Sequence, residues 1–363
     1  MSYSALYDPL LLDALSWQEI EDLVILHGEE EARRSVSESG LLNITRMPGE
    51  TFKGLFRFEK HHLDEILHRL KMPAEVLSAQ RVRVPGVEAL CMTLRRLAYP
   101  NRLLDLELLF GRHVSVISSV VSTVMSHIDY YFFHLLADMT THRWLTLPKL
   151  DLFSEAVHAT GAPLKNCWGF IDGTARRICR PSLLQQEHFS GHKRFHVLKY
   201  QAVMCANGII CQLDGPFRGR RHDGGILREP NLYDNLEKLC QGHKFFVIYG
   251  DPAYPLRPLL LKLYGGSSLR PHEAHFNPIM STVRQAVEWG FGKVAGDFAF
   301  VDYHKNQRLH LQRLGRMYTT LLANCHTCLY GSQVTDFFVS IRHHLMSIWC
   351  LFHLMLSRRI KPG

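Results

Sequence analysis

Two aspartates directly follow runs of apolar residues that have the length of buried strands. Asp172 comes after Trp168–Ile171 and before Gly173, and Asp251 comes after Phe245–Gly250. Because ligands of open α/β sheets bind at the ends of strands, both carboxylates can meet a substrate, and neighbouring strands would bring them close together. Like charges at that distance repel unless a cation lies between them, and such hard oxygen ligands suit Mg²⁺ or Mn²⁺. The alternative is that each aspartate only caps the turn that follows it.

A third carboxylate, Glu288, lies in the segment Ser281–Val294, which has helical periodicity. This helix could lay Glu288 across the strand ends and complete a cage of three carboxylates for two metal ions. One ion would activate a nucleophilic water, and the other would stabilise the leaving oxygen of a phosphodiester. Alternatively, Glu288 only forms an ion pair with Arg284, which lies one turn earlier. Periodicity does not decide between the two.

Six short motifs occur in a fixed order around these acids. They are FIDGT at 170–174, GHK at 191–193, GRRHD at 219–223, GDPAYP at 250–255, VEWGFGK at 287–293 and NCHTCLYG at 324–331. Over about 165–333 the series resembles the DDE-superfamily endonuclease domain of Harbinger-type transposases and their domesticated, nuclease-like relatives. The resemblance implies an RNase H-like fold, and it carries a catalytic and metal-binding triad onto Asp172, Asp251 and Glu288, with two Mg²⁺ or Mn²⁺ ions.

The elements that must position this triad follow from the spacing of apolar residues, which changes between Pro148 and Pro163. Residues 51–147 have helical spacing. The later part predicts strands at Cys167–Ile171, His196–Cys205, Ile209–Leu213 and Phe245–Tyr249, and helices near Asp223–Leu239, Pro255–Leu263, Ser281–Val294 and Arg313–Leu329. We therefore predict an α/β protein with an RNase H-like mixed sheet flanked by helices, preceded by an all-helical N-terminal domain. The predicted divisions are an acidic helical segment at 1–50, a helical domain at 51–150, the endonuclease domain at 165–335 and an apolar, His-rich tail at 336–363.

Charge is distributed unevenly along the 363 residues. Residues 1–50 carry a net charge of −7 and residues 51–363 carry +15, for a total of +8. A basic body of this size favours a polyanionic partner, either nucleic acid or an anionic membrane surface. Six bases near the predicted site could hold phosphates, and a solvated face is the equal alternative. They are Lys193, Arg194, Lys199, Arg218, Arg220 and Arg221.

Residues 103–128 have the pattern of a helix, a tight turn at Gly111 and a second helix, as in a helix-turn-helix. We predict that Arg112 and Ser115 contact nucleic acid there, mostly at phosphates. The exposed face of the second helix offers serine hydroxyls rather than Arg or Lys, so bidentate reading of bases is poorly provided for. An ordinary packed helix is the alternative.

Three further groups of polar residues have weaker assignments. Asp223, after His222, either caps the next helix or lies beside the metal site. A zinc site at Cys325–Cys328 is disfavoured, because structural zinc takes four ligands and no second cysteine pair with suitable spacing follows. A metal role is equally disfavoured for the segment His272–His275, which we expect to form a loop.

These observations predict a transposase-derived, divalent-metal-dependent DNA endonuclease that cleaves phosphodiester bonds by a two-metal mechanism. The alternative is a domesticated, catalytically silent DNA-binding or scaffold protein that retains the fold. DNA is the expected partner. The resemblance adds a separate DNA-binding partner protein and a location in the nucleus, with the cytoplasm as the alternative, and leaves a homodimer open.

Neither a membrane nor a disulfide framework is expected. No apolar run approaches the roughly 20 residues that a spanning helix needs. The nine cysteines are odd in number and irregularly spaced, so we expect reduced thiols.

Overall fold

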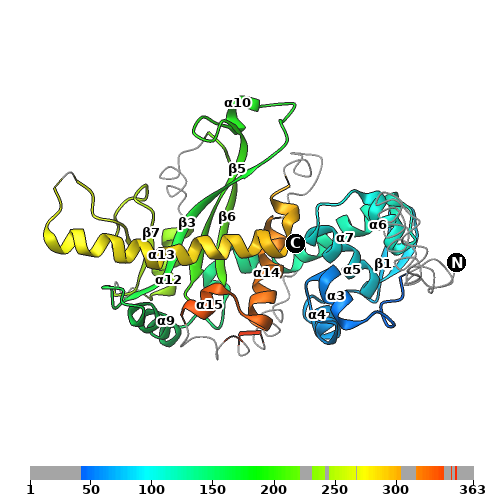
Figure 1. Ribbon diagram of the computed structural model, residues 1–363, viewed down its shortest axis with the longest axis horizontal. Helices are drawn as coiled ribbons and strands as arrows, with labels where there is room; N and C mark the ends of the chain where they lie inside the picture. Colours follow the sequence, from blue (N-terminus) through cyan, green and yellow to red (C-terminus); the bar gives the residue numbers. More distant parts are fainter. Residues whose placement is uncertain are drawn as a thin grey trace, which may run out of the picture.

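The computed structural model describes residues 42–220, 231–241, 245–266, 268–303 and 316–338, together with Leu345, Ile348 and Trp349. Figure 1 shows a helical N-terminal region beside a sheet with its own helices, and α13 crossing the strands of the sheet. The predicted helix near Leu10–Ile25 and the motif His222-Asp223 lie outside the described residues.

The N-terminal region packs around α5, which is buried along almost its whole length. Its helices are α3 (Gly49–Phe56), α4 (Leu63–Arg69), α5 (Gly86–Ala98), α6 (Leu103–Phe110), α7 (Val114–Phe132) and α8 (His134–Ala137). The region is not all-helical as predicted, because β1 (Glu75–Leu77) and β2 (Arg83–Pro85) form an antiparallel pair that buries Val76 against Val84. Three residues per strand are too few to show an alternating pattern in the sequence.

The second region is built on a mixed sheet. Its strands are β3 (Cys167–Arg177), β4 (Phe189–Ser190), β5 (Phe195–Cys205), β6 (Ile210–Arg218), β7 (Val247–Gly250) and β8 (Leu260–Leu261). β5 lies antiparallel between β3 and β6, while β7 is parallel to β3 on its other edge and β8 is parallel to β7. This mixed sheet with flanking helices, behind a helical region, confirms the predicted RNase H-like α/β fold.

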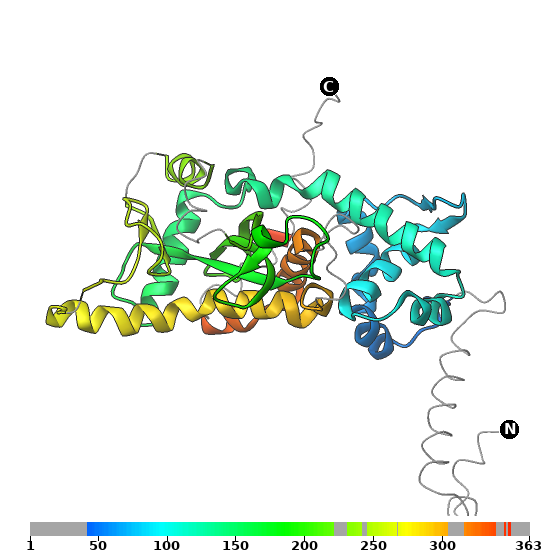
Figure 2. The ribbon, with the colours of Figure 1, turned by 90° about the horizontal axis from the view of Figure 1, so that it is seen from above.

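Helices cover both faces of the sheet, as Figure 2 shows. α13 (Pro271–Asp297) lies along one face and packs on β3, with Ala286, Val287 and Gly290 among its buried residues. α8 and α9 (Leu147–Ala159) lie on the opposite side, where α9 packs on β3 and α8 on β6. α9 thus packs with the sheet although it falls in the range predicted for the helical domain. The remaining helices are α10 (Gln185–His188), α12 (Asn231–Leu239), α14 (Arg316–Tyr330) and α15 (Gln333–Phe337).

Two predicted elements are wrong. The segment Pro255–Leu263 is not helical, and its end forms β8, where Leu260 and Leu261 pair with the open edge of β7. The segment His272–His275 is not a loop, because α13 begins at Pro271 with Glu273 closing a capping box on Arg270. Proline is favoured at the first position of a helix, and Pro271 occupies that position in α13.

Among the described residues, no single helix has the length and apolar character needed to cross a membrane. α6 and α7 meet that criterion only as a pair, and they are bent by 98° relative to each other. No cysteine in the described part of the chain forms a disulfide.

Candidate active site

Asp172 and Asp251 come from adjacent parallel strands. The last registered pair of β3 and β7 joins Ile171 to Gly250, so the next residue along each strand is one of the two aspartates. The condition on which the sequence argument depends, that these strands are neighbours, is therefore met.

The local setting of the two aspartates differs from the prediction. β3 does not end at Asp172 but continues to Arg177, because β5 pairs with it past this point, and Gly173 stays in the sheet instead of turning the chain. Asp251 does follow the end of β7, and its Oδ1 accepts a hydrogen bond from the Ala253 N–H at 2.8 Å. The turn-capping role thus applies to Asp251, which does not prevent its second oxygen from binding another group.

Arg284 on α13 joins Asp172 to Glu288. Its Nη1 donates to Asp172 Oδ2 at 2.8 Å and its Nη2 donates to Glu288 Oε1 at 3.4 Å. The side chains of Arg284 and Asp172 are 18% and 16% exposed, whereas that of Glu288 is 56% exposed. Two residues after Glu288, α13 packs closely on the sheet. A Cβ on Gly290 would come within 2.4 Å of Met204 Sδ on β5. The predicted ion pair of Arg284 with Glu288 is present, but the shorter contact is to Asp172.

The electrostatics of the site are dominated by burial of one acid. The pKa of the Asp172 carboxyl is raised from 3.8 to about 6, chiefly by burial; Arg284 and the Gly173 N–H oppose this rise, and the charges of Asp251 and Glu288 add to it. The charges of the other two acids therefore both act on the Asp172 carboxyl group. Side chains whose pKa is shifted by burial and by neighbouring charges are concentrated at functional sites.

The residue types fit a divalent cation. Three carboxylates supply the hard oxygen donors that Mg²⁺ and Mn²⁺ prefer, and the raised pKa of Asp172 reflects a charge that additional positive charge would stabilise. Within the described residues, no three His, Cys, Asp or Glu side chains converge on a single point that could hold a metal ion. In this conformation Arg284 supplies the positive charge next to Asp172.

The predicted phosphate-binding bases lie along the sheet, leading away from the acids. Lys199 is on β5, three residues before the partner of Asp172, and Arg218 is near the end of β6. Arg220 follows β6, while Lys193 and Arg194 form the exposed turn between β4 and β5. Arg221 lies outside the described residues.

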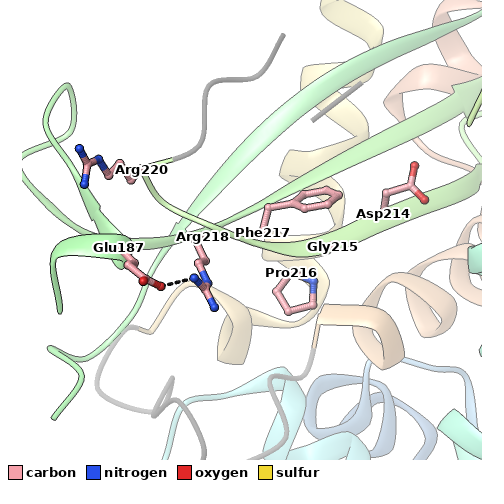
Figure 3. Close-up of a pocket in the computed structure, with 7 residues that line it drawn as sticks. All are labelled: Glu187, Asp214, Gly215, Pro216, Phe217, Arg218 and Arg220. Carbon is pink, nitrogen blue, oxygen red and sulfur yellow. Dashed lines mark ion pairs between the residues drawn. The ribbon is translucent and has the colours of Figure 1, made fainter. Parts of the chain in front are cut away.

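A cavity of about 760 Å³ lies beside β6, on the side of the bases Arg218 and Arg220. Figure 3 shows these two arginines toward one end of the cavity and Asp214 toward the other. Glu187 also lines it and forms an ion pair with Arg218. The cavity is therefore a second polar surface, separate from the three acids.

The helix-turn-helix pattern has the predicted elements, but the structure gives Arg112 a different role. α6 and α7 are joined by Gly111 in the left-handed conformation (φ 62°). Arg112 Nε and Nη2 donate to the two oxygens of Glu88 at 2.7 and 2.8 Å, and the two side chains are only 12% and 8% exposed. Ser115 is hydrogen-bonded to His113 at the start of α7. The guanidinium of Arg112 is thus held inside the helical region, which argues against its predicted contact with phosphate.

The disfavoured zinc residues take other positions. Cys325 and Cys328 are buried, and burial raises the pKa of the Cys325 thiol to about 12. Lys293 Nζ donates hydrogen bonds to His326 Nδ1 at 2.9 Å and to Asp297 Oδ2 at 2.8 Å. These contacts tie α14 to α13.

The contact between Arg284 and Asp172 is not among the contacts predicted from the sequence. The one-turn spacing predicts only the ion pair of Arg284 with Glu288 on the same helix. A cation one turn before an acid, on a helix expected to cross the strand ends, was the signal that it could also reach an acid on the sheet.

Comparisons with known proteins agree with this geometry. Residues 171–325 match the DDE superfamily endonuclease family, a range that includes Asp172, Asp251 and Glu288. Searches of the curated proteins and of the solved structures gave no match. The chain therefore contains a DDE superfamily endonuclease domain over residues 171–325.

Proposed function

We propose that this protein is a divalent-metal-dependent DNA endonuclease of Harbinger-type transposase descent, with Asp172, Asp251 and Glu288 as its catalytic residues. The observation that carries the proposal is the parallel register of β3 and β7, which makes Asp172 and Asp251 neighbours. α13, which carries Glu288, packs on β3. DNA is the partner and the nucleus the location in this proposal.

Each residue has a definite task. Asp172 and Asp251, with Glu288, would hold divalent cations, whose chemistry is to activate a water and to stabilise the leaving oxygen of a phosphodiester. The Asp172 side chain is more buried than that of Glu288, and its carboxylate is held by the Gly173 N–H and by Arg284. Glu288 is the most exposed, and α13 lets it reach the substrate side of the site.

A catalytically silent DNA-binding or scaffold protein is the second candidate. The observation that favours it is Arg284, which pairs with two of the three acids. In a silent protein this cation would be a permanent structural partner. In an enzyme, Arg284 would either stay beside the bound metal as an additional positive charge or give up its contact with Asp172 when the metal binds.

Nicking of supercoiled plasmid in Mg²⁺ tests the proposal. We expect the wild type to nick and Asp172→Asn to lose at least about a hundredfold in rate, since it removes a metal ligand. Asp151→Asn is the matched control, because Asp151 is an exposed acid on α9. Equal rates for the wild type and Asp172→Asn would refute the assignment of the site. Tight Mn²⁺ binding by the wild type that is lost in Asp172→Asn would separate the enzyme from the silent scaffold.

A further inference from the structure

The sheet extends beyond its helices as an arm. We define the arm as residues 174–199 and 214–220, which comprise the ends of β3, β5 and β6 together with α10 and β4. Figure 1 shows α10 at the far end of these strands, away from α13. Ala202 of β5 pairs with Asp172, and β5 begins seven residues earlier at Phe195, so the start of β5 lies about 23 Å from Asp172 along the strand.

The arm is strongly basic. It contains eight Lys and Arg residues and two acids, a net charge of +6 in a chain whose total is +8. Four of these bases, Arg177, Arg180, Lys193 and Arg194, are exposed near the tip. Glu187, one of the two acids, is already paired with Arg218. A polyanion is therefore the partner whose charge complements this surface.

The tip of the arm also exposes large apolar side chains. Leu183 is 71% exposed, Leu184 is 54% exposed and Phe189 is 41% exposed. Leu184 lies in the left-handed region with φ 54°, which a residue with a branched side chain seldom adopts. Strained backbone of this kind is concentrated at functional sites. We therefore expect a binding partner to cover Leu183 and Leu184 at the tip of the basic arm.

We propose that the arm binds duplex DNA along its phosphates and that Leu183 and Leu184 enter a groove and press between base pairs. Duplex DNA combines an anionic exterior with apolar base faces, which is the combination that a cationic arm with an apolar tip fits. Proteins that bend DNA insert leucine and similar wedges at base steps in this way, while Arg and Lys hold the backbone. The inference deepens the proposed function, on whose DNA substrate it rests.

The geometry also gives the place of the contact. A duplex lying along the arm advances 3.4 Å per base pair, so 23 Å corresponds to about seven base pairs between Asp172 and the start of β5, the end of the arm to which α10 and the two leucines before it belong. The wedge would hold the duplex in register at that distance from the phosphodiester to be cut. A protein surface or an anionic membrane could also contact leucines, but neither would unstack bases at a fixed distance.

Binding of a duplex that carries 2-aminopurine tests the wedge. The measurements are made in EDTA on the full chain, so that cleavage plays no part. We expect the wild type to raise 2-aminopurine fluorescence most strongly about seven base pairs from the cut position. The double variant Leu183→Ser with Leu184→Ser should lose that rise and bind about tenfold more weakly by fluorescence anisotropy. Leu77→Ser is the control, because Leu77 is 57% exposed on β1, far along the chain from the arm.

A second pair of variants tests the phosphate contacts independently. Lys193→Gln with Arg194→Gln should weaken binding and reduce the slope of log K against log salt by about 1.8, since each phosphate contact contributes about 0.9. The leucine variants should leave this slope unchanged.

Several outcomes would overturn the proposal. These are unchanged affinity and fluorescence in the leucine variants, or leucine-dependent binding to phosphatidylserine vesicles or to a second copy of the chain with no effect on DNA. A protein that shows the wedge signal but never nicks plasmid would contradict the proposed function alone. A protein whose leucine variants bind and nick like the wild type would contradict the wedge alone.

Discussion

Replacing Asp172 by Asn should make the protein more stable at neutral pH while removing a proposed catalytic group. Burial is the main cause that raises the pKa of this carboxyl from 3.8 to about 6. The side chain is only 16% exposed, so solvent screens the effect weakly. At 1.36 kcal/mol per pKa unit, the shift corresponds to about 3 kcal/mol of unfolding free energy. Asn has nearly the same shape, and its amide oxygen can still accept the hydrogen bond from Arg284 Nη1.

The stability difference must follow pH in one direction. Because the pKa of Asp172 is higher in the folded protein than in the unfolded chain, the folded state binds more protons between about pH 4 and 6. Stability of the wild type therefore falls as pH rises through this window, and the loss is complete above about pH 7. Below about pH 3 the carboxyl is largely protonated in both states. The variant should then have no advantage over the wild type.

Urea unfolding followed by circular dichroism, in EDTA and from about pH 4 to 8, measures this difference. Asp151→Asn is the control and should change the unfolding free energy by less than about 0.5 kcal/mol at every pH, as exposed substitutions do. The reasoning fails if Asp172→Asn is no more stable than the wild type at pH 8. It also fails if the difference is the same across the whole pH range, because the cause would then not be ionisation. A gain in stability with a loss of nicking would show that the site is maintained for function.

Two further substitutions test the packing on which the site depends. Gly290→Ala should destabilise the protein by about 1–3 kcal/mol, because its Cβ would lie 2.4 Å from Met204 Sδ, whereas Gly292→Ala has open space and should stabilise α13 by about 0.5–1 kcal/mol. Thermal unfolding of the two variants checks this pair, and equal effects would contradict the close packing of α13 on β5. Arg112→Met should cost about 3–5 kcal/mol in urea unfolding, because it leaves the carboxylate of Glu88 buried without its partner. A loss below about 1 kcal/mol there would mean that Arg112 is a surface residue after all.

The sequence predicted those parts of the structure that depend on local pattern. The strands leading to Asp172 and Asp251 were recognisable as apolar runs, and the small, buried face of α13 was recognisable from Ala286, Val287 and Gly290. The roles of the three acids stay a prediction, since geometry brings them near one another without showing their use.

Contacts between distant residues account for what was missed. Residues 173–177 have no apolar alternation, and they remain in β3 because β5 pairs with them. Arg112 looked like a surface cation because its partner, Glu88, lies 24 residues earlier in the chain. The segment Pro255–Leu263 has leucines at helical spacing, but pairing of Leu260 with β7 decides its conformation. In each case a long-range partner overrides the local signal.

The charges at the site also set a requirement for any substrate. Asp172, Asp251 and Glu288 carry −3 when ionised and Arg284 carries +1, so these four side chains sum to −2 in a chain whose net charge is +8. A basic arm can bring a polyanion to the molecule, but a phosphate at the acids adds negative charge where Asp172 is already destabilised by burial. Additional positive charge is therefore needed at the moment of binding, beyond what Arg284 supplies. The behaviour of Arg284 therefore distinguishes the two candidate functions: in a silent protein its guanidinium would stay paired with Asp172, whereas in an enzyme it would yield that carboxylate to a divalent cation.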